Sequence, residues 1–176
     1  MNFLSRAEIQ AEILSLPEPT RSLVKASWNQ RTPPTHCYRM PSDTARLAAL
    51  GRILMGLVQF KKAPIIWISE TIVWSADEDL DLLRGYRRGL GESRDEGEAP
   101  ATKFFVGEET AFLSIIRMAL FFTWDTWIFE SQSNRLCMQI SHDAVISMWT
   151  GDETTSRFVS EAIKRFSLTE LQTTPR

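Results

Sequence analysis

The pattern of apolar and polar positions predicts a series of helices and strands. Near the start, Ser5 and Glu8 have the spacing of a helix capping box, and the apolar positions that follow recur with a helical period until a proline. Residues 20–30 could add a second helix, whereas residues 31–41 contain three prolines and predict irregular backbone. We expect residues 1–41 to form an N-terminal helical arm that could be mobile.

A long amphipathic helix is predicted from Ser42, because leucines at helical spacing share one face while polar side chains lie opposite. Pro64 ends it. Gly51 and Gly56 lie inside this helix, where each glycine costs about 1 kcal/mol relative to alanine. We therefore expect both glycines to allow close packing of a neighbouring element.

The middle of the chain predicts a strand, a charged helix and a loop. Residues 64–74 are rich in Ile, Val and Trp and suit one strand or a tight pair. Ser75 and Glu78 repeat the capping-box spacing before a helix whose acidic residues precede its arginines, as the helix dipole favours. Residues 91–102 predict an exposed acidic loop, and residues 103–106 a short strand.

The most apolar stretch, residues 113–131, is predicted to be the packed centre of the domain. A helix expected from Gly107 to about residue 121 is apolar on nearly every side, with Ser114 and Arg117 as its polar positions. A membrane span would need about 20 mainly apolar residues. Arg117 and Asp125 interrupt the run, so we interpret it as a core segment rather than a span.

The remaining segments predict a β-hairpin and a closing helix. Aromatic and β-branched residues at 123–131 are followed by the alternating pattern of residues 135–141. Residues 144–149 predict a third strand, with a helix capped by Asp143 as the alternative. A final helix is expected from Asp152.

Together these elements predict one α+β domain in which an antiparallel sheet with a C-terminal β-hairpin packs against several helices. After the arm we expect an α+β core at residues 42–170 and a polar tail at residues 171–176. A chain of 176 residues hides about 70% of its unfolded surface on folding, so it needs no metal or disulfide for stability.

Composition changes this picture little. The net charge of −2 and the pI of about 5.8 make the protein slightly acidic, with no general attraction to nucleic acid or anionic membranes. The first dozen residues are charged, which argues against a secretory signal, and we expect a cytoplasmic protein. Cys37 and Cys137 are expected to be free thiols there. The chain is rich in tryptophan, which serves both cores and interfaces.

The sequence "SHD" at residues 141–143 contains the residue types of a nucleophilic triad. Adjacent side chains on a strand point to opposite faces, however, whereas a triad must converge in space. We interpret the motif as a strand end where Ser141 and Asp143 satisfy turn or capping hydrogen bonds. A general acid or base at His142 is the alternative.

Asp125 is the acid of greatest interest, because it lies between Trp124 and Trp127. A carboxylate among aromatic rings must be ion-paired, hydrogen-bonded or raised in pKa. We expect a structural ion pair, for which Arg117 could be the partner, or a cap at the helix-to-strand turn. The alternative is a binding or catalytic carboxylate in an aromatic-lined pocket. The candidate pocket residues are Asp125, Trp124, Trp127, Arg117, His142 and Asp143.

Metal and cofactor signatures are missing from the sequence. The two histidines and two cysteines do not have the spacing of a zinc module, and no phosphate-binding or dinucleotide-binding glycine motif occurs. We expect no metal and no cofactor. The arginines around Tyr86 are better explained as helix C-terminal bases than as a nucleic-acid patch, because nearby acids would oppose phosphate.

These patterns favour a non-enzymatic domain that binds another protein, as an inhibitor, an immunity-type protein or a subunit of an assembly. An acidic loop would suit a basic partner. Its candidate residues are Glu92, Asp95, Glu96 and Glu98. The alternative is a small enzyme or a small-ligand-binding domain that uses Asp125 in its pocket.

Overall fold

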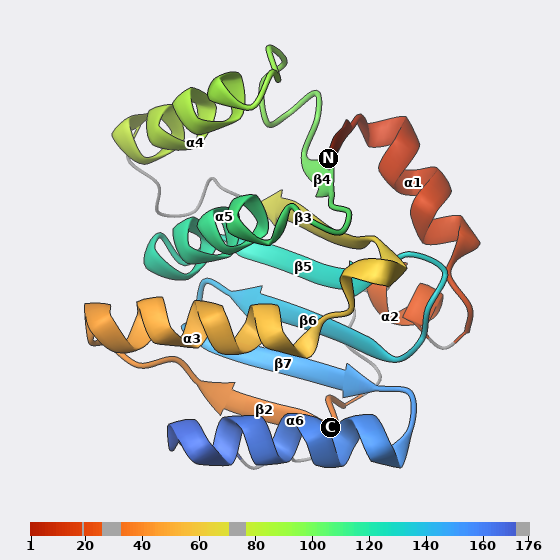
Figure 1. The fold of residues 1–176 in the computed structure, drawn as a ribbon, viewed down its shortest axis with the longest axis vertical. Coiled ribbons are helices and arrows are strands. Elements are labelled where there is room, and N and C mark those ends of the chain that lie inside the picture. The colour runs from red at the N-terminus through yellow and green to blue at the C-terminus, as the bar shows by residue number, and fades with distance from the viewer. Residues whose placement is uncertain (19, 26–32, 71–76, 172–176) are drawn as a thin grey trace.

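The computed structural model describes residues 1–18, 20–25, 33–70 and 77–171. In these residues the chain forms a seven-stranded antiparallel sheet in the order β1-β4-β3-β5-β6-β7-β2, with helices packed on it (Figure 1). The predicted α+β class is confirmed. The strands are β1 (Asn2–Leu4), β2 (His36–Arg39), β3 (Pro64–Glu70), β4 (Ala101–Lys103), β5 (Asp125–Glu130), β6 (Leu136–Ser141) and β7 (Val145–Thr150). The helices are α1 (Arg6–Ser15), α2 (Thr20–Lys25), α3 (Thr44–Leu57), the short 3-10 helix η1 (Phe60–Lys62), α4 (Asp77–Gly89), α5 (Glu109–Phe121) and α6 (Glu153–Phe166).

Both outer strands of the sheet come from the first 41 residues. β1 pairs with β4, and β2 pairs with β7 with Tyr38 opposite Ile146. The irregular backbone predicted for residues 31–41 is therefore wrong over β2, where the chain becomes extended after its prolines. The division of the chain at residue 42 stays a prediction.

The segment after α6 runs along the free edge of β2. The Arg39 N–H donates to the Thr169 carbonyl at 3.0 Å, and the Leu171 N–H donates to the Cys37 carbonyl at 2.8 Å. These bonds cover backbone groups of an edge strand that would otherwise face solvent. The predicted polar tail thus begins with a residue tied to the sheet, and its residues 172–176 lie outside the described chain.

The sheet is buried on both faces. α3, α5 and α6 lie across the face that carries Met138 and Met148 (Figure 1), while α1 packs on the opposite face against Trp127 and Phe129. The alternation predicted for β6 is present, but Cys137 between the apolar positions is buried as well. Helices on both sides therefore remove the solvent-facing surface that an alternating strand usually has.

The apolar stretch at residues 113–131 is the centre of the fold, as predicted. Its first part is the end of α5, which is buried on most sides. A β-carbon on Gly51 would lie 3.1 Å from Arg117 Cγ, so glycine permits the close approach of α3 and α5. Gly56 does not share this role, because a β-carbon there would meet nothing within 4 Å. The prediction of close packing is confirmed at Gly51 and wrong at Gly56.

Local signals for helix starts are largely confirmed. Ser5 and Glu8 form the predicted capping box, and the Asp152 carboxylate accepts from the Thr155 N–H at the start of α6. The box predicted at Ser75 lies outside the described residues. In the described chain, no helix combines the length and apolar character needed to cross a bilayer.

Two strand predictions have different outcomes. The strand predicted at residues 144–149 is β7, Val145–Thr150, so the alternative helix capped by Asp143 is wrong. The short strand predicted at residues 103–106 overlaps β4 only at Lys103. The pairing of β4 with β3 ends there with a hydrogen bond of 2.9 Å from the Phe104 N–H to the Pro64 carbonyl.

A buried ion pair joins the β5–β6 turn to the end of α3. Glu130 is fully buried and accepts hydrogen bonds from the guanidinium of Arg135. It also accepts from the Gln59 N–H at 2.9 Å and from the Ser133 hydroxyl at 3.1 Å. Arg135 in turn donates to the Leu57 carbonyl at 2.5 Å, which satisfies a terminal group of the helix. Each charge offsets the cost of removing the other from water.

Removing the Glu130 charge should destabilise the fold. Glu130→Gln leaves the Arg135 cation without its partner, and we expect the free energy of unfolding to fall by about 3 kcal/mol, the lower end of the range for breaking a buried pair, because Arg135 keeps some solvent contact. Urea unfolding measures the change. Glu98→Gln on the exposed loop is the control and should change stability by less than about 0.5 kcal/mol. Equal stability of both variants would contradict the role given to Glu130.

Candidate functional site

Asp125 is paired with His142 across the sheet. The Asp125 Oδ1 atom accepts from the His142 backbone N–H at 2.9 Å, and Oδ2 lies 2.7 Å from His142 Nδ1. A carboxylate can only accept, so the Nδ1 atom carries the proton in this contact. The pair joins the start of β5 to the turn after β6. It brings together two of the residues that the sequence singled out.

Arg117 and the two tryptophans are not arranged around Asp125 as the sequence predicted. Arg117, the expected partner of Asp125, instead donates from Nε to the Ala48 carbonyl at 3.4 Å. The rings of Trp124 and Trp127 are buried in different cores, on opposite faces of the sheet. They therefore do not form the two walls of one pocket around Asp125. The prediction of the Arg117 partner is wrong because strand register, not closeness in sequence, decides which side chains meet.

The "SHD" motif forms a turn. The Ser141 hydroxyl accepts from the Asp143 N–H at 3.2 Å, as the structural interpretation predicts. Asp143 Oδ1 lies 3.7 Å from His142 Nε2, too far for a hydrogen bond, and its side chain is exposed. This geometry supplies no converging serine, histidine and acid.

A serine, a histidine and an acid do approach one another elsewhere. Ser156 Oγ lies 2.9 Å from His36 Nε2, and Glu170 Oε1 lies 3.8 Å from His36 Nδ1. The second distance is too long for the hydrogen bond that orients a catalytic histidine, and Glu170 is 65% exposed. We interpret the contact as a tie that joins β2, α6 and the segment after α6. Sequence reasoning missed it because 120 positions separate His36 from Ser156.

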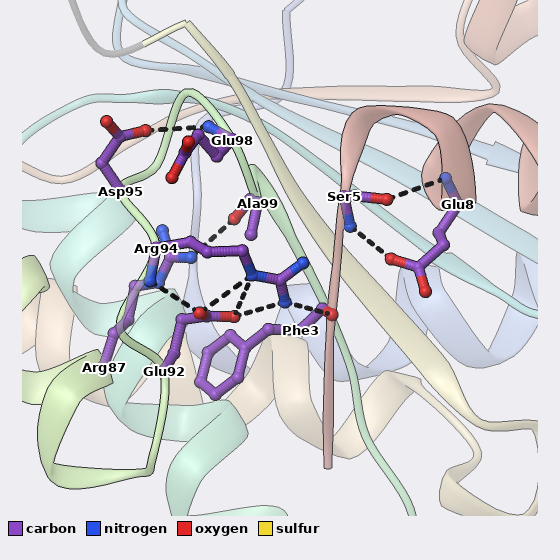
Figure 2. Close-up of polar contacts among 9 residues, drawn as sticks. All are labelled: Phe3, Ser5, Glu8, Arg87, Glu92, Arg94, Asp95, Glu98 and Ala99. Atoms are coloured by element: carbon purple, nitrogen blue, oxygen red, sulfur yellow. Dashed lines mark hydrogen bonds and ion pairs between the residues drawn. The ribbon is translucent and has the colours of Figure 1, made fainter.

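Arg94 within the acidic loop holds the loop to β1 (Figure 2). Arg94 Nε donates to both carboxylate oxygens of Glu92, at 3.0 and 3.2 Å, and Arg94 also donates to the Phe3 carbonyl. Hydrogen bonds from Arg94 lower the pKa of Glu92 to about 2. Glu92 is buried rather than displayed. A basic partner would have to break this contact before it could bind Glu92.

The neighbouring charged residues also form hydrogen bonds within the chain. Glu96 accepts two hydrogen bonds from Arg84, at 3.1 and 2.6 Å. Asp95 accepts from the Glu98 N–H at 2.8 Å (Figure 2). Arg87 is buried, with its guanidinium over the Phe3 ring at 5.3 Å and a hydrogen bond of 2.7 Å to the Ala99 carbonyl. Four candidate partner residues were predicted on this loop, and two of them have arginine partners in the chain.

The described residues hold no group of three or more histidine, cysteine or acidic side chains that could bind a metal ion. Cys37 and Cys137 are free thiols, as predicted. Burial raises the pKa of the Cys137 thiol, which keeps it protonated and unreactive.

An apolar groove lies between α3 and α6 on one side of the molecule. It has a volume of about 330 Å³, and Phe158 beside it is 48% exposed. The lining residues are Ile53, Gly56, Leu57, Phe158, Ala162, Arg165 and Phe166. Gly56 leaves the groove open because no side chain fills the space above it. The available signal in the sequence is Gly56, but a glycine inside a helix predicts close packing rather than an open groove.

Comparison with protein-family models, with curated proteins and with solved structures finds no match to this chain. Its candidate sites therefore have to be judged on their own geometry.

The Asp125–His142 contact should contribute to stability. We expect Asp125→Ala and His142→Ala each to lower the free energy of unfolding by about 1–2 kcal/mol, the usual effect of losing a charged hydrogen bond. In the double variant the losses should not add, and the coupling energy should be about 1 kcal/mol. Denaturant unfolding of the wild type, the two single variants and the double variant gives the coupling energy. A coupling energy near zero would contradict the pairing.

The Glu92–Arg94 contact predicts a pH dependence. The folded pKa of about 2 lies below the ordinary value of 4.5, so this contact stabilises the fold above pH 4.5 and is lost as the pH falls toward 2. As the pH falls from 4.5 to 2, the Tm of Glu92→Gln and of Arg94→Gln should decrease less than the Tm of the wild type. Thermal unfolding at a series of pH values measures this. If both variants lose as much Tm as the wild type, the contact does not form.

Proposed function

We propose that this protein is a non-enzymatic interaction domain whose α3–α6 groove binds an acidic amphipathic helix of another protein. The groove carries the proposal, because it combines an apolar floor, an exposed aromatic ring and basic side chains at one place. It replaces the acidic loop as the partner surface, since Glu92 and Glu96 are bound to arginines of the same chain.

The groove has the shape and surface that suit a helical partner. It is lined almost wholly by apolar side chains and runs between two helices that lie side by side. A groove of this kind takes the apolar stripe of an amphipathic helix. Phe158 would lose its exposure on binding, and aromatic residues that become fully buried are common sources of binding energy.

The charges on the α3 side of the groove favour an acidic partner. Residues 44–62 carry four basic side chains and no acidic one, although the whole chain has a net charge of −2. Arg52 and Lys61 are exposed on this segment, and Arg165 lines the groove itself. Acidic residues beside the partner's apolar stripe would complement these charges and speed the encounter.

Filling the groove should abolish binding without harming the fold. A β-carbon on Gly56 meets nothing within 4 Å, so Gly56→Leu places a side chain in the groove and should raise helix stability by about 1 kcal/mol. Tagged wild-type and variant proteins serve as bait in a lysate of the native cells, washed at low and high salt. We expect one stoichiometric protein on the wild type, lost at high salt, and about tenfold less on the variant.

Gly85→Leu is the matched control. Gly85 lies in α4, and a β-carbon there also meets nothing within 4 Å, so the same substitution adds an exposed leucine away from the groove. This variant should retain the partner as the wild type does. Equal retention by all three proteins, retention of a second copy of the chain alone, or retention of nothing would each contradict the proposal.

A further inference from the structure

A second hollow lies on another side of the fold, among segments that are distant in sequence. It has a volume of about 490 Å³, within the range of about 300–1,000 Å³ that is usual for small-molecule sites. α1, the end of β3, α4 and the 96–100 segment form its walls. It shares no lining residue with the α3–α6 groove.

Trp67 supplies the flat apolar wall of this hollow. It lies within β3 between Ile66 and Ile68, which are buried on the other face of the sheet, while its own ring is only partly buried. Leu80 and Pro100 add apolar surface. A planar ring placed against Trp67 would gain both burial and stacking.

The charges of the lining favour an anion. Arg84 and Glu96 neutralise each other through two hydrogen bonds, at 3.1 and 2.6 Å. Arg6 donates from Nε to the Gly97 carbonyl at 2.6 Å, which fixes the side chain in place. The two remaining guanidinium nitrogens of Arg6 are the donors that carboxylate, sulfonate and phosphate groups recognise. Gln10 lies one helical turn further along α1 and offers a neutral polar group.

We propose that this hollow binds a small planar aromatic anion, with the ring against Trp67 and the anionic group on Arg6. The site is separate from the partner groove and needs no metal. It differs from the pocket that the sequence predicted, because Asp125 is not among its lining residues.

The test uses two fluorescent probes that differ by one sulfonate group. 1-Anilinonaphthalene-8-sulfonate carries the anion, and N-phenyl-1-naphthylamine has the same rings without it. Wild-type protein should bind the sulfonate about tenfold more tightly than the neutral probe, as expected for one charged hydrogen-bonding group. In Arg6→Gln this preference should disappear, while binding of the neutral probe stays the same.

Two further variants locate the binding site. Gln10→Trp fills the hollow from the surface of α1 and should lower the affinity for both probes about tenfold or more. Gly56→Leu fills the α3–α6 groove and should leave the affinity for both probes unchanged. Loss of binding in Gly56→Leu with none in Arg6→Gln would place the probe in the groove and overturn the proposal. An equal affinity of the wild type for both probes, or no binding of either, would also overturn it.

Discussion

The position of α3 depends on the buried pair of Glu130 and Arg135. A carboxylate removed from water is unstable unless charged and polar groups surround it, and here the Arg135 guanidinium and the Gln59 N–H do so. Because Arg135 also binds the Leu57 carbonyl, the end of the helix is held against the β5–β6 turn. The groove that α3 forms with α6 is therefore held at the Leu57 end of α3 by a contact with the sheet.

Composition alone gives a misleading view of this protein's surface. The chain is slightly acidic, yet Glu92 and Glu96 are bound by Arg94 and Arg84, which fold the loop onto β1 and α4. Their charges cancel within the protein. α3 and η1 themselves carry basic residues and no acidic one, so the side of the groove that they form is basic. A surface that combines apolar and basic character favours an acidic helix more than the overall charge suggests.

Local signals were enough to predict the helices and the β-hairpin. The capping box at Ser5, the cap at Asp152 and the apolar α5 all act over a few residues, and each is confirmed. Short edge strands such as β1 and β2 gain stability from pairing with distant strands, so their own residues give little signal. The same limit explains why the partner of Asp125 could not be predicted from the sequence. Asp125 meets His142 rather than Arg117 because strand pairing brings together residues 17 positions apart.

The claim that α3 and α6 recognise a partner can be tested most directly by amide hydrogen exchange. The free protein would be compared with the same protein bound to its captured partner. Binding in the groove predicts slower exchange in the second half of α3 and the middle of α6, around Gly56 and Phe158, with little change in the acidic loop at residues 91–102. Slower exchange confined to that loop, or to the walls of the Trp67 hollow, would contradict the account.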